Sequence, residues 1–201
     1  MPIRLTTRAG EFSASHVVVQ DVTGSPVKEG VLLQSLTVES EPLNVRIQSS
    51  CLFSESFWAT DCDCALQLQT ALDLIAAKGG LVLYFYEEGR GVGLATKFEA
   101  MRLQQLHDLD TRRAYECLNL APDARSYSAA AAVLKKILKP EGAIRLWSNN
   151  RDKEANLRRE GINVSERVRL ICGWNIPAVR RYLMDKRTAL GHDIPESMPA
   201  N

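Results

Sequence analysis

Three cysteines form the pattern in this sequence that is best suited to chemistry. Cys51 is separated by ten residues from the tight pair Cys62 and Cys64. Three thiolates occupy three corners of a tetrahedral zinc ion and leave the fourth open, which distinguishes a reactive zinc site from a structural one. The histidines nearest in the sequence, His16 and His107, are tens of residues away. We therefore predict a zinc site with these three cysteines as ligands and with water at the fourth position.

Two plainer interpretations of these cysteines stay open at this point. Cysteine is often buried as a small apolar residue, and the spacing alone also permits a disulfide between Cys51 and Cys62. The sequence has five cysteines, of which Cys117 and Cys172 are the others, and it shows neither a charged and then apolar leader nor a long apolar run. We expect a cytoplasmic protein on these grounds. In that reducing compartment a cysteine cluster favours metal binding or catalysis.

The composition fits one globular unit with no general attraction for polyanions. The 201 residues are 45% hydrophobic and 24% charged, which is enough for one well-packed core. The 25 basic and 24 acidic residues give a net charge of +1, so we expect neither nucleic acid nor a membrane as a partner. We predict a catalytic domain over residues 1–173 and a C-terminal helical segment over residues 174–201, whose Pro-containing and Ser-containing end, Ile194–Asn201, is disordered.

Short apolar runs separated by turn residues predict strands in the first quarter of the chain. The runs are Ser15–Gln20, Gly30–Leu36 and Leu43–Ser49, and Gly24-Ser25-Pro26 forms a turn between the first two. We predict that these strands are antiparallel.

Helices and strands then alternate along the chain. In Ala65–Lys78 the residues Leu68, Leu72 and Ile75 recur at helical spacing, and Gly79-Gly80 ends the helix. The next predicted elements are a strand at Leu81–Tyr86, a helix carrying Leu94, Phe98 and Met101, a helix at Ser128–Leu138, a strand at Ile144–Trp147, a helix at Lys153–Glu160 and a strand at Ile162–Val168. The expected class is α+β, a mixed sheet with N-terminal antiparallel strands followed by α/β alternation and helices packed on the sheet.

Polar residues gather in three loops that follow predicted strands or precede a helix. Each loop has a plain explanation when taken alone. Glu87–Leu94 fits a tight glycine-rich turn, Asp123 and Arg125 fit a surface pair or helix cap, and Ser148–Lys153 fits a polar loop. Glycines also let the backbone approach a ligand, and Arg90 can donate two parallel hydrogen bonds to a phosphate. Together with an open metal triad, the three loops predict one pocket for a phosphorylated ligand.

Taken in order, these residues resemble the GTP cyclohydrolase II family. The motifs that carry the resemblance are Arg46-Ile47-Gln48-Ser49-Ser50-Cys51, Cys62-Asp63-Cys64 with Gln67-Leu68, Glu88-Gly89-Arg90-Gly91-Val92-Gly93-Leu94, Asp123-Ala124-Arg125, and Asn149-Asn150 with Lys153. The resemblance extends from Arg8–Phe12 to Gly191-His192, which is nearly the whole chain. It implies a homodimeric enzyme that uses zinc and magnesium to open the imidazole ring of GTP on the route to riboflavin.

The resemblance also implies roles for individual residues. Cys51, Cys62 and Cys64 take the zinc-ligand positions. Asp123 falls on the proposed proton acceptor, and Arg125 on the arginine proposed to attack the α-phosphate and expel pyrophosphate. Because the pKa of a guanidinium exceeds about 12, Asp123 would have to hold or deprotonate Arg125 for that attack. The substrate-binding positions carry over to Arg46, Ile47, Gln48, Ser49, Ser50, Gln67, Glu88, Gly89, Arg90, Thr111, Ser148 and Lys153.

The sequence departs from the family at several positions. Met101 stands where the family carries a catalytic tyrosine, and a thioether cannot donate a proton. We hypothesise that the reaction therefore stops at a formylamino-pyrimidine nucleotide, with pyrophosphate but no formate released. Asp61 and Tyr86 replace arginines, so that a different or less phosphorylated purine nucleotide is an alternative substrate. The remaining departures are Gln48 for His, Ser50 for Glu, Ala65 for Gly and Glu87 for Gln.

Met101 also supports a hypothesis of another class, in which the protein is a non-catalytic purine-nucleotide sensor that keeps the zinc site. Retention of Asp123, Arg125 and all three cysteines favours the enzyme, because a binding protein has no need for an open metal position.

Overall fold

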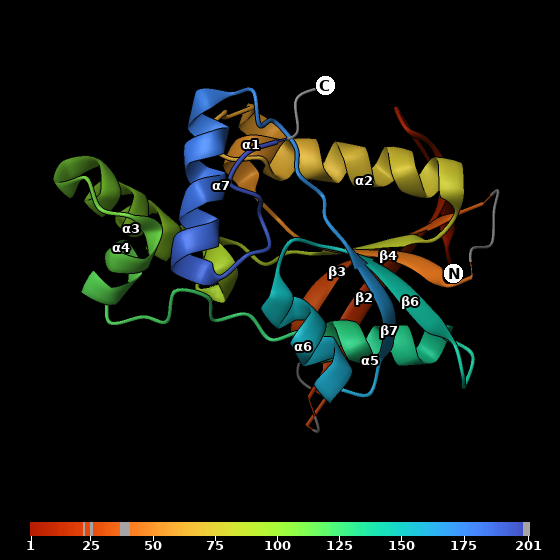
Figure 1. Cartoon of the computed structure of the whole chain (residues 1–201). Helices are drawn as coiled ribbons and strands as arrows, with labels where there is room; N and C mark the ends of the chain where they lie inside the picture. Colours follow the sequence, from red (N-terminus) through yellow and green to blue (C-terminus); the bar gives the residue numbers. More distant parts are fainter. Residues whose placement is uncertain (22, 25, 37–40, 199–201) are drawn as a thin grey trace.

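The computed structural model describes residues 1–21, 23–24, 26–36 and 41–198. Within them a seven-stranded sheet has the order β1-β2-β3-β5-β4-β6-β7, with helices on both faces (Figure 1). The mixed sheet with packed helices that the sequence predicts is confirmed. The strands are β1 (Ile3–Thr7), β2 (Gly10–Gln20), β3 (Pro26–Ser35), β4 (Leu43–Ser49), β5 (Leu81–Phe85), β6 (Ala143–Trp147) and β7 (Asn163–Val168). The helices are α1 (Leu52–Phe57), α2 (Cys64–Lys78), α3 (Leu94–His107), α4 (Thr111–Cys117), α5 (Ser128–Ile137), α6 (Arg151–Arg159) and α7 (Pro177–Leu190), with a 3-10 turn, η1, at Gly89–Gly91.

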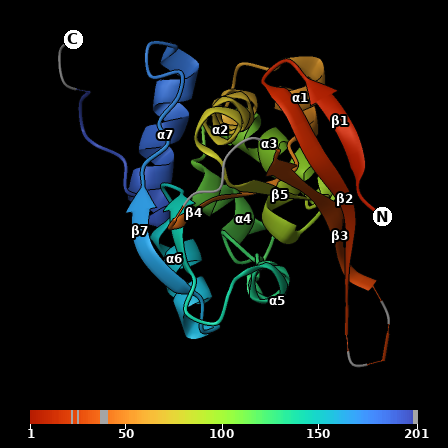
Figure 2. The same ribbon diagram turned by 90° about the vertical axis from the view of Figure 1, so that its right-hand side faces the viewer.

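The first three strands form an antiparallel ribbon at one side of the molecule (Figure 2). β3 continues this pattern by pairing antiparallel with β5. Burial alternates along β2, where Phe12 and Ala14 are buried, Glu11 is exposed and Ser13 is partly exposed. Because Glu11 and Ser13 interrupt the apolar run, the prediction from Ser15 onward missed the first half of this strand. Of the predicted turn at Gly24-Ser25-Pro26, Ser25 lies outside the described residues.

The prediction that Leu43–Ser49 is antiparallel is wrong. β4 pairs parallel with β5 on one side and with β6 on the other. The apolar pattern of a buried strand does not encode its direction, which here is set by the helices α1 and α2 that return the chain across the sheet.

The parallel strands bring three loops to one edge of the sheet. The chain passes from β4 to its neighbour β5, and then crosses back over β4 to reach β6 on the far side. The carboxyl ends of β4, β5 and β6 therefore lie together at a point where the strand order reverses, which is where open sheets of this kind bind ligands.

Two apolar layers hold the helices against the sheet. On one face, Ala71 and Ile75 of α2 pack in a cluster with Phe12 and Val82. On the other, α5 and α6 pack in a larger cluster around Leu134. Figure 1 shows α2 above the sheet and α5 and α6 below it.

Two short helices were not predicted. α1 has six residues and begins without a side-chain cap, and α4 has seven residues, with Asp110 accepting a hydrogen bond from the Arg113 N–H at 2.8 Å. Segments this short contain too few turns for helical periodicity to be recognised.

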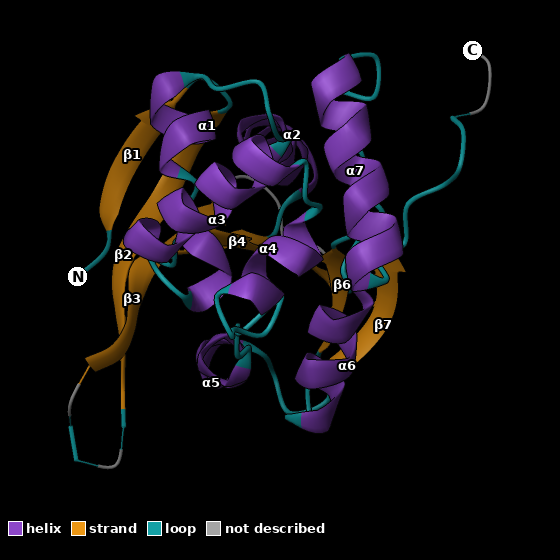
Figure 3. Ribbon diagram, turned by 90° about the vertical axis from the view of Figure 1, so that its left-hand side faces the viewer, coloured by secondary structure: helices purple, strands orange, loops and turns teal. Residues whose placement is uncertain are grey.

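The C-terminal segment contains the helix that the composition predicts, and α7 lies beside α4 (Figure 3). After it, Ile194 is buried against Val179 and Leu183, so this first residue of the segment predicted to be disordered packs on the protein. Residues 199–201 lie outside the described part. No helix among the described residues has the length and apolar character needed to cross a membrane.

Gly30 provides a test of the packing between β3 and β5. A Cβ atom at this position would lie 2.1 Å from the Tyr84 carbonyl oxygen. We expect Gly30→Ala to lower the free energy of unfolding by about 3 kcal/mol or more, because backbone atoms of two paired strands would have to separate. Glu29→Ala, at the exposed neighbouring position, should change it by less than about 0.5 kcal/mol in the same denaturant titration. Equal midpoints for Gly30→Ala and the wild type would contradict this register.

Candidate active site

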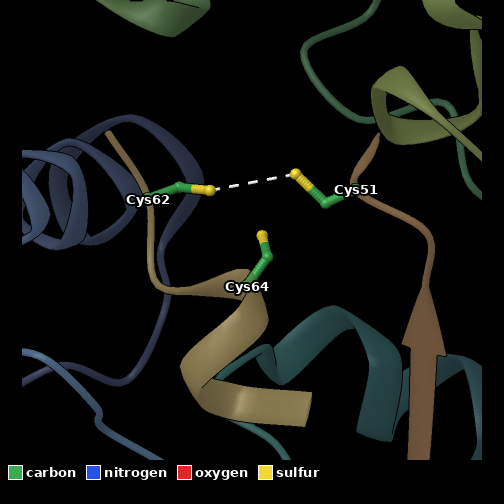
Figure 4. Close-up of side chains that lie close together, drawn as sticks. All are labelled: Cys51, Cys62 and Cys64. Carbon is green, nitrogen blue, oxygen red and sulfur yellow. Dashed lines mark hydrogen bonds between the residues drawn. The ribbon is translucent and has the colours of Figure 1, made fainter. Parts of the chain in front are cut away.

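The three predicted zinc ligands converge in space. Cys51 follows β4 and precedes α1, Cys64 is the first residue of α2, and Cys62 lies in the segment just before it. Their sulfur atoms lie within 4.8 Å of one another and point toward a common centre (Figure 4). Among the residues that the structure describes, no fourth His, Cys, Asp or Glu joins this cluster.

The spacing of the sulfur atoms suits a tetrahedral metal ion and excludes a disulfide. The Sγ atoms of Cys51 and Cys62 are 3.8 Å apart, and all five cysteines are free. Zinc–sulfur bonds of about 2.3 Å at tetrahedral angles place two sulfurs about 3.8 Å apart. A disulfide would require about 2.05 Å. The three residues therefore fit zinc as ligands, with one position left for another molecule.

Contacts among the thiols favour the deprotonated form of one of them. Hydrogen bonds with Cys51 and Cys64 lower the pKa of the Cys62 thiol to about 3. Hydrogen bonds with Cys51 and Cys62 raise the pKa of the Cys64 thiol, and burial raises it further. Lys97, which was not predicted, lies with its Nζ 3.4 Å from Cys51 Sγ and 2.6 Å from Glu88 Oε1. Burial alone would lower the pKa of Lys97, but Glu88 and Cys51 raise it, so the ammonium stays charged.

A chain of buried polar side chains supports the thiols from behind. It starts at Glu55, which accepts hydrogen bonds from the Cys51 N–H and from Gln48 Nε2. Gln48 Oε1 accepts from Arg46, and Arg46 also donates to Gln67 Oε1 at 2.6 Å. Gln67 in turn donates to Asp63, the residue between Cys62 and Cys64. Arg46 and Gln48 alternate with apolar residues on β4, and both side chains are buried. Polar residues inside a buried strand are a signal of function that can be seen in the sequence, but the prediction chose these two residues only from the family resemblance.

The glycine-rich loop after β5 is held in a compact turn. Arg90 has a φ of 58°, and its guanidinium donates to the Pro122 carbonyl at 3.2 Å. Tyr115 fixes the loop from below by donating its hydroxyl hydrogen to the Gly89 carbonyl at 3.1 Å. Gly91 has a φ of 92°, a backbone conformation that residues with a side chain rarely adopt. The Ala124 N–H donates to the Arg90 carbonyl at 3.2 Å, which joins this loop to the loop that carries Asp123 and Arg125.

Asp123 and Arg125 form the close pair that their spacing suggests. Arg125 donates to both carboxylate oxygens of Asp123, with Nε to Oδ1 at 2.8 Å. Burial acts to raise the pKa of Asp123, but the hydrogen bonds and charge of Arg125 lower it. Burial likewise acts to lower the pKa of Arg125, but Tyr127 and Asp123 raise it. In this resting arrangement Arg125 is a cation and Asp123 a carboxylate.

The third loop, after β6, supplies a buried lysine. Asn150 caps α6 by accepting hydrogen bonds from the backbone N–H groups of Asp152 and Lys153. Lys153 Nζ donates to the Ile47 carbonyl at 2.8 Å and is only 5% exposed. Burial, together with the charges of Arg46 and Arg125, lowers the pKa of Lys153 well below its ordinary value. The hydrogen-bond acceptors described for Arg46 and Lys153 are amide and carbonyl oxygens, so no carboxylate contacts either of these two groups directly.

These groups share one cavity of about 560 Å³. Of the predicted site residues, Asp123 alone does not line it, and it lies behind Arg125. The lining residues that were predicted are Arg46, Ile47, Gln48, Ser49, Ser50, Cys51, Cys62, Cys64, Gln67, Glu88, Gly89, Arg90, Met101, Thr111, Arg125, Ser148 and Lys153. The cavity therefore joins the open side of the thiol cluster to the cationic loops.

Some of the residues that depart from the family pattern line the cavity and others do not. Met101 lines the cavity one helical turn after Lys97, and Asp61 also lines it. Tyr86 does not line the cavity and is 59% exposed, so its replacement of an arginine does not change the charge of the cavity wall. Glu87 lines the cavity but is paired with Lys28 at 2.7 Å.

One wall of the cavity comes from the C-terminal segment, to which the sequence assigned no site residue. Tyr182 and Lys186 of α7 and His192 beyond it line the cavity. Burial, with the charges of Lys186 and Arg125, lowers the pKa of His192 to about 3, so this imidazole is neutral at physiological pH. In the sequence analysis His192 served only to mark the end of the family resemblance.

Comparison with known proteins agrees with this geometry. The family model for GTP cyclohydrolase II matches residues 2–169. The chain belongs to the GTP cyclohydrolase II family. It is 41% identical over 154 residues to GTP cyclohydrolase-2 of Blochmanniella pennsylvanica, covering 76% of this chain and 75% of the relative. It is 39% identical over 193 residues to GTP cyclohydrolase-2 of Azotobacter vinelandii, covering 94% and 88%.

A further relative is the riboflavin biosynthesis protein RibBA of Bacillus subtilis, 40% identical over 156 residues, or 76% of this chain and 37% of the relative. The family membership expected from the motifs is thus confirmed, and the protein is a GTP cyclohydrolase II-like hydrolase.

The low pKa of Lys153 predicts that anion binding takes up a proton. A polyphosphate beside Lys153 favours the ammonium form and raises its pKa, so uptake occurs between the low pKa of the free site and the raised pKa of the complex. Above the free-site pKa, affinity should therefore fall as the pH rises. Calorimetry with inorganic pyrophosphate at pH 8, in two buffers of different ionisation enthalpy, measures this uptake.

The matched variants for this experiment are Lys153→Arg and Lys135→Met. Lys153→Arg keeps a cation that does not titrate and should reduce the uptake by close to one proton, whereas Lys135→Met, at an exposed position of α5, should leave it unchanged. Equal proton uptake by Lys153→Arg and the wild type would contradict the assignment to Lys153.

Proposed function

We propose that this protein is a zinc-dependent cyclohydrolase that opens the imidazole ring of GTP, releases pyrophosphate and stops at the formylamino-pyrimidine nucleotide. The observation that carries the proposal is the single cavity in which three convergent thiols with an open side meet a cluster of buried cations. A purine nucleoside triphosphate matches both parts of this cavity. Its base would lie at the thiol cluster, where the ring is hydrolysed, and its negatively charged phosphates would lie at the buried cations.

Zinc and magnesium enter the proposal in different ways. Zinc held by Cys51, Cys62 and Cys64 would supply a Lewis-acidic position that lowers the pKa of water toward about 7. The carboxylates nearest the phosphate region are already paired, Glu88 with Lys97 and Asp123 with Arg125. The described residues thus offer magnesium no free carboxylate cluster, and we expect any magnesium to be held mainly by the phosphates of the nucleotide.

The protein's own residues bind and orient the substrate in this proposal. Arg125 and Lys153 are placed to bind phosphate oxygens. The charge of Arg125 is already balanced by Asp123, whereas burial and the charges of Arg46 and Arg125 disfavour the ammonium form of Lys153 until an anion binds. For Arg125 to act as the nucleophile that the family resemblance implies, Asp123 would have to take its proton, and the low pKa of Asp123 opposes this in the resting site. The geometry supports electrostatic binding of the phosphates by Arg125 before any such step.

The proposed end product follows from Met101. Hydrolysis at C8 of the purine breaks one C–N bond of the five-membered ring and leaves a formyl group on the remaining nitrogen. A second water would release that group as formate. Met101 lines the cavity with a thioether that neither donates a proton nor orients water strongly. The second hydrolysis therefore lacks the tyrosine hydroxyl that the family resemblance expects at this position.

The first experiment tests zinc-dependent turnover. Zinc-loaded protein with GTP and magnesium should release pyrophosphate, and Cys51→Ser should reduce the rate by about 100-fold or more, because loss of a metal ligand costs at least as much as loss of an outer partner. Cys117→Ser, which changes an exposed cysteine outside the cluster, is the control and should retain the wild-type rate. Turnover that survives chelation and the Cys51→Ser change would refute the metal site.

The second experiment tests the product. Mass spectrometry should find the formylated pyrimidine nucleotide and pyrophosphate from the wild type, with formate well below stoichiometric. Met101→Tyr should restore formate release toward one per pyrophosphate, and Met101→Leu, which is also apolar, should not. Stoichiometric formate from the wild type would eliminate the proposed arrest.

Two alternatives are separated by the same assays. Asp61 places a carboxylate on the cavity wall where the family resemblance expects an arginine, which favours a less phosphorylated purine nucleotide as substrate. Turnover of such a nucleotide in preference to GTP would support this alternative. Tight nucleotide binding without any hydrolysis by zinc-loaded protein would instead support the sensor.

The homodimer and the cytoplasmic location stay predictions.

A further inference from the structure

We propose that Lys186 of α7 is a positioning residue for the thiol cluster, and that its ion pair with Asp63 holds Cys62 and Cys64 in the geometry that binds zinc. The inference rests on the proposed function in one respect, that zinc is the ligand of the three thiols. Lys186 lies beyond residue 169, where the matched family model ends.

Asp63 does not use its carboxylate to cap the backbone of its own helix. It occupies the N-cap position of α2, where an aspartate usually accepts a hydrogen bond from the first turn, yet it makes no side-chain cap hydrogen bond. Its Oδ1 accepts from Lys186 Nζ at 3.1 Å, and its Oδ2 accepts from Gln67 Nε2. The residue is 0% exposed. Lys186 is the cation that balances this buried charge by direct contact.

Lys186 is itself firmly placed. Its side chain is 12% exposed, and its Nζ lies 4.1 Å from the ring centroid of Tyr182, one turn earlier in α7. The helix is anchored by Val179 and Leu183, which are fully buried. The ammonium is therefore presented by a packed helix rather than by a mobile surface side chain.

The position of Asp63 explains why this contact would control the thiols. Asp63 lies between two ligands, so fixing its carboxylate fixes the backbone on which both Cys62 and Cys64 are carried. The preceding residues 59–63 belong to no helix or strand. A buried carboxylate that loses its cation is costly to leave uncompensated, which favours movement of its side chain toward water. Such a movement would shift the anchor between the two cysteines.

Lys186 differs in this from Lys97, which contacts the thiol of Cys51 directly. The hydrogen bond described for the Lys186 ammonium goes to Asp63 and not to a sulfur atom, although its charge also acts on the Cys64 thiol. Because Lys186 also lines the cavity, direct binding of the nucleotide is the rival role to be tested. The two roles separate when zinc affinity is measured without nucleotide.

The test measures the zinc dissociation constant of the full-length chain by competition with a chromophoric chelator. Lys186→Met should weaken zinc binding by about 10-fold to 100-fold, the usual effect of losing an outer partner of a metal site. Lys186→Arg keeps the ion pair and should remain close to the wild type. Arg180→Met removes a cation from an exposed position of the same helix and should have no effect. The absorption spectrum of bound cobalt, used in place of zinc, should change in Lys186→Met and not in Arg180→Met.

Asp63→Asn provides the second arm and covers the case in which Lys186→Met does not fold. It should weaken zinc binding to a similar extent, and the double variant should lose less than the sum of the two single losses in free energy, because the pair is already broken. Unchanged zinc affinity and cobalt spectrum in Lys186→Met or Asp63→Asn, including a result in which only nucleotide binding is lost, would overturn the inference and leave the proposed function intact. A wild-type protein that binds no zinc would overturn both.

Discussion

The convergence of three thiols on one point, with one side left open, is the constraint on which the rest of this structure depends. Sulfur atoms 3.8 Å apart cannot all carry charge unless cations compensate them, and their side chains must be held against mutual repulsion. The protein supports them with a buried hydrogen-bonded chain from Glu55 through Arg46 to Asp63. No described buried side-chain nitrogen or oxygen lacks a partner, so the chain is complete as well as continuous.

The cavity beside the thiols contains buried cationic side chains. Arg46 and Lys153 both lie in surroundings that lower their pKa values by burial. Such groups are costly to keep charged in an empty site, and a polyanionic ligand relieves that cost when it binds. The Asp123–Arg125 pair is different, because its charges compensate each other before any ligand arrives. Lys97 and Lys186 are likewise paired, with Glu88 and Asp63, so the cavity combines cations that are balanced in advance with cations that await an anion.

The position of these groups follows from sheet topology. The thiol of Cys51, the glycine-rich loop and the loop before α6 follow β4, β5 and β6, which are adjacent and parallel. The glycine-rich loop also contacts the loop of Asp123 and Arg125, which follows no strand, through the hydrogen bond from the Ala124 N–H to the Arg90 carbonyl. Met101 places an apolar side chain on the cavity wall within this same framework, so the family fold is compatible with the altered final step that we propose.

The sequence by itself determined the residue chemistry and the repeating local patterns. The cysteine spacing, the glycine-rich turn, the long helices and the strand Leu43–Ser49 were all predictable, because each depends on neighbours in the chain. Tertiary structure decided what local patterns do not encode. It set the parallel direction of β4 and placed Arg125, with Asp123 bound to it, at the cavity wall. It also brought Lys97 into contact with Cys51, and Lys186 into contact with Asp63. Lys186 is the clearest case, since it lies more than a hundred residues from the carboxylate it contacts, and only the packing of α7 brings the two together.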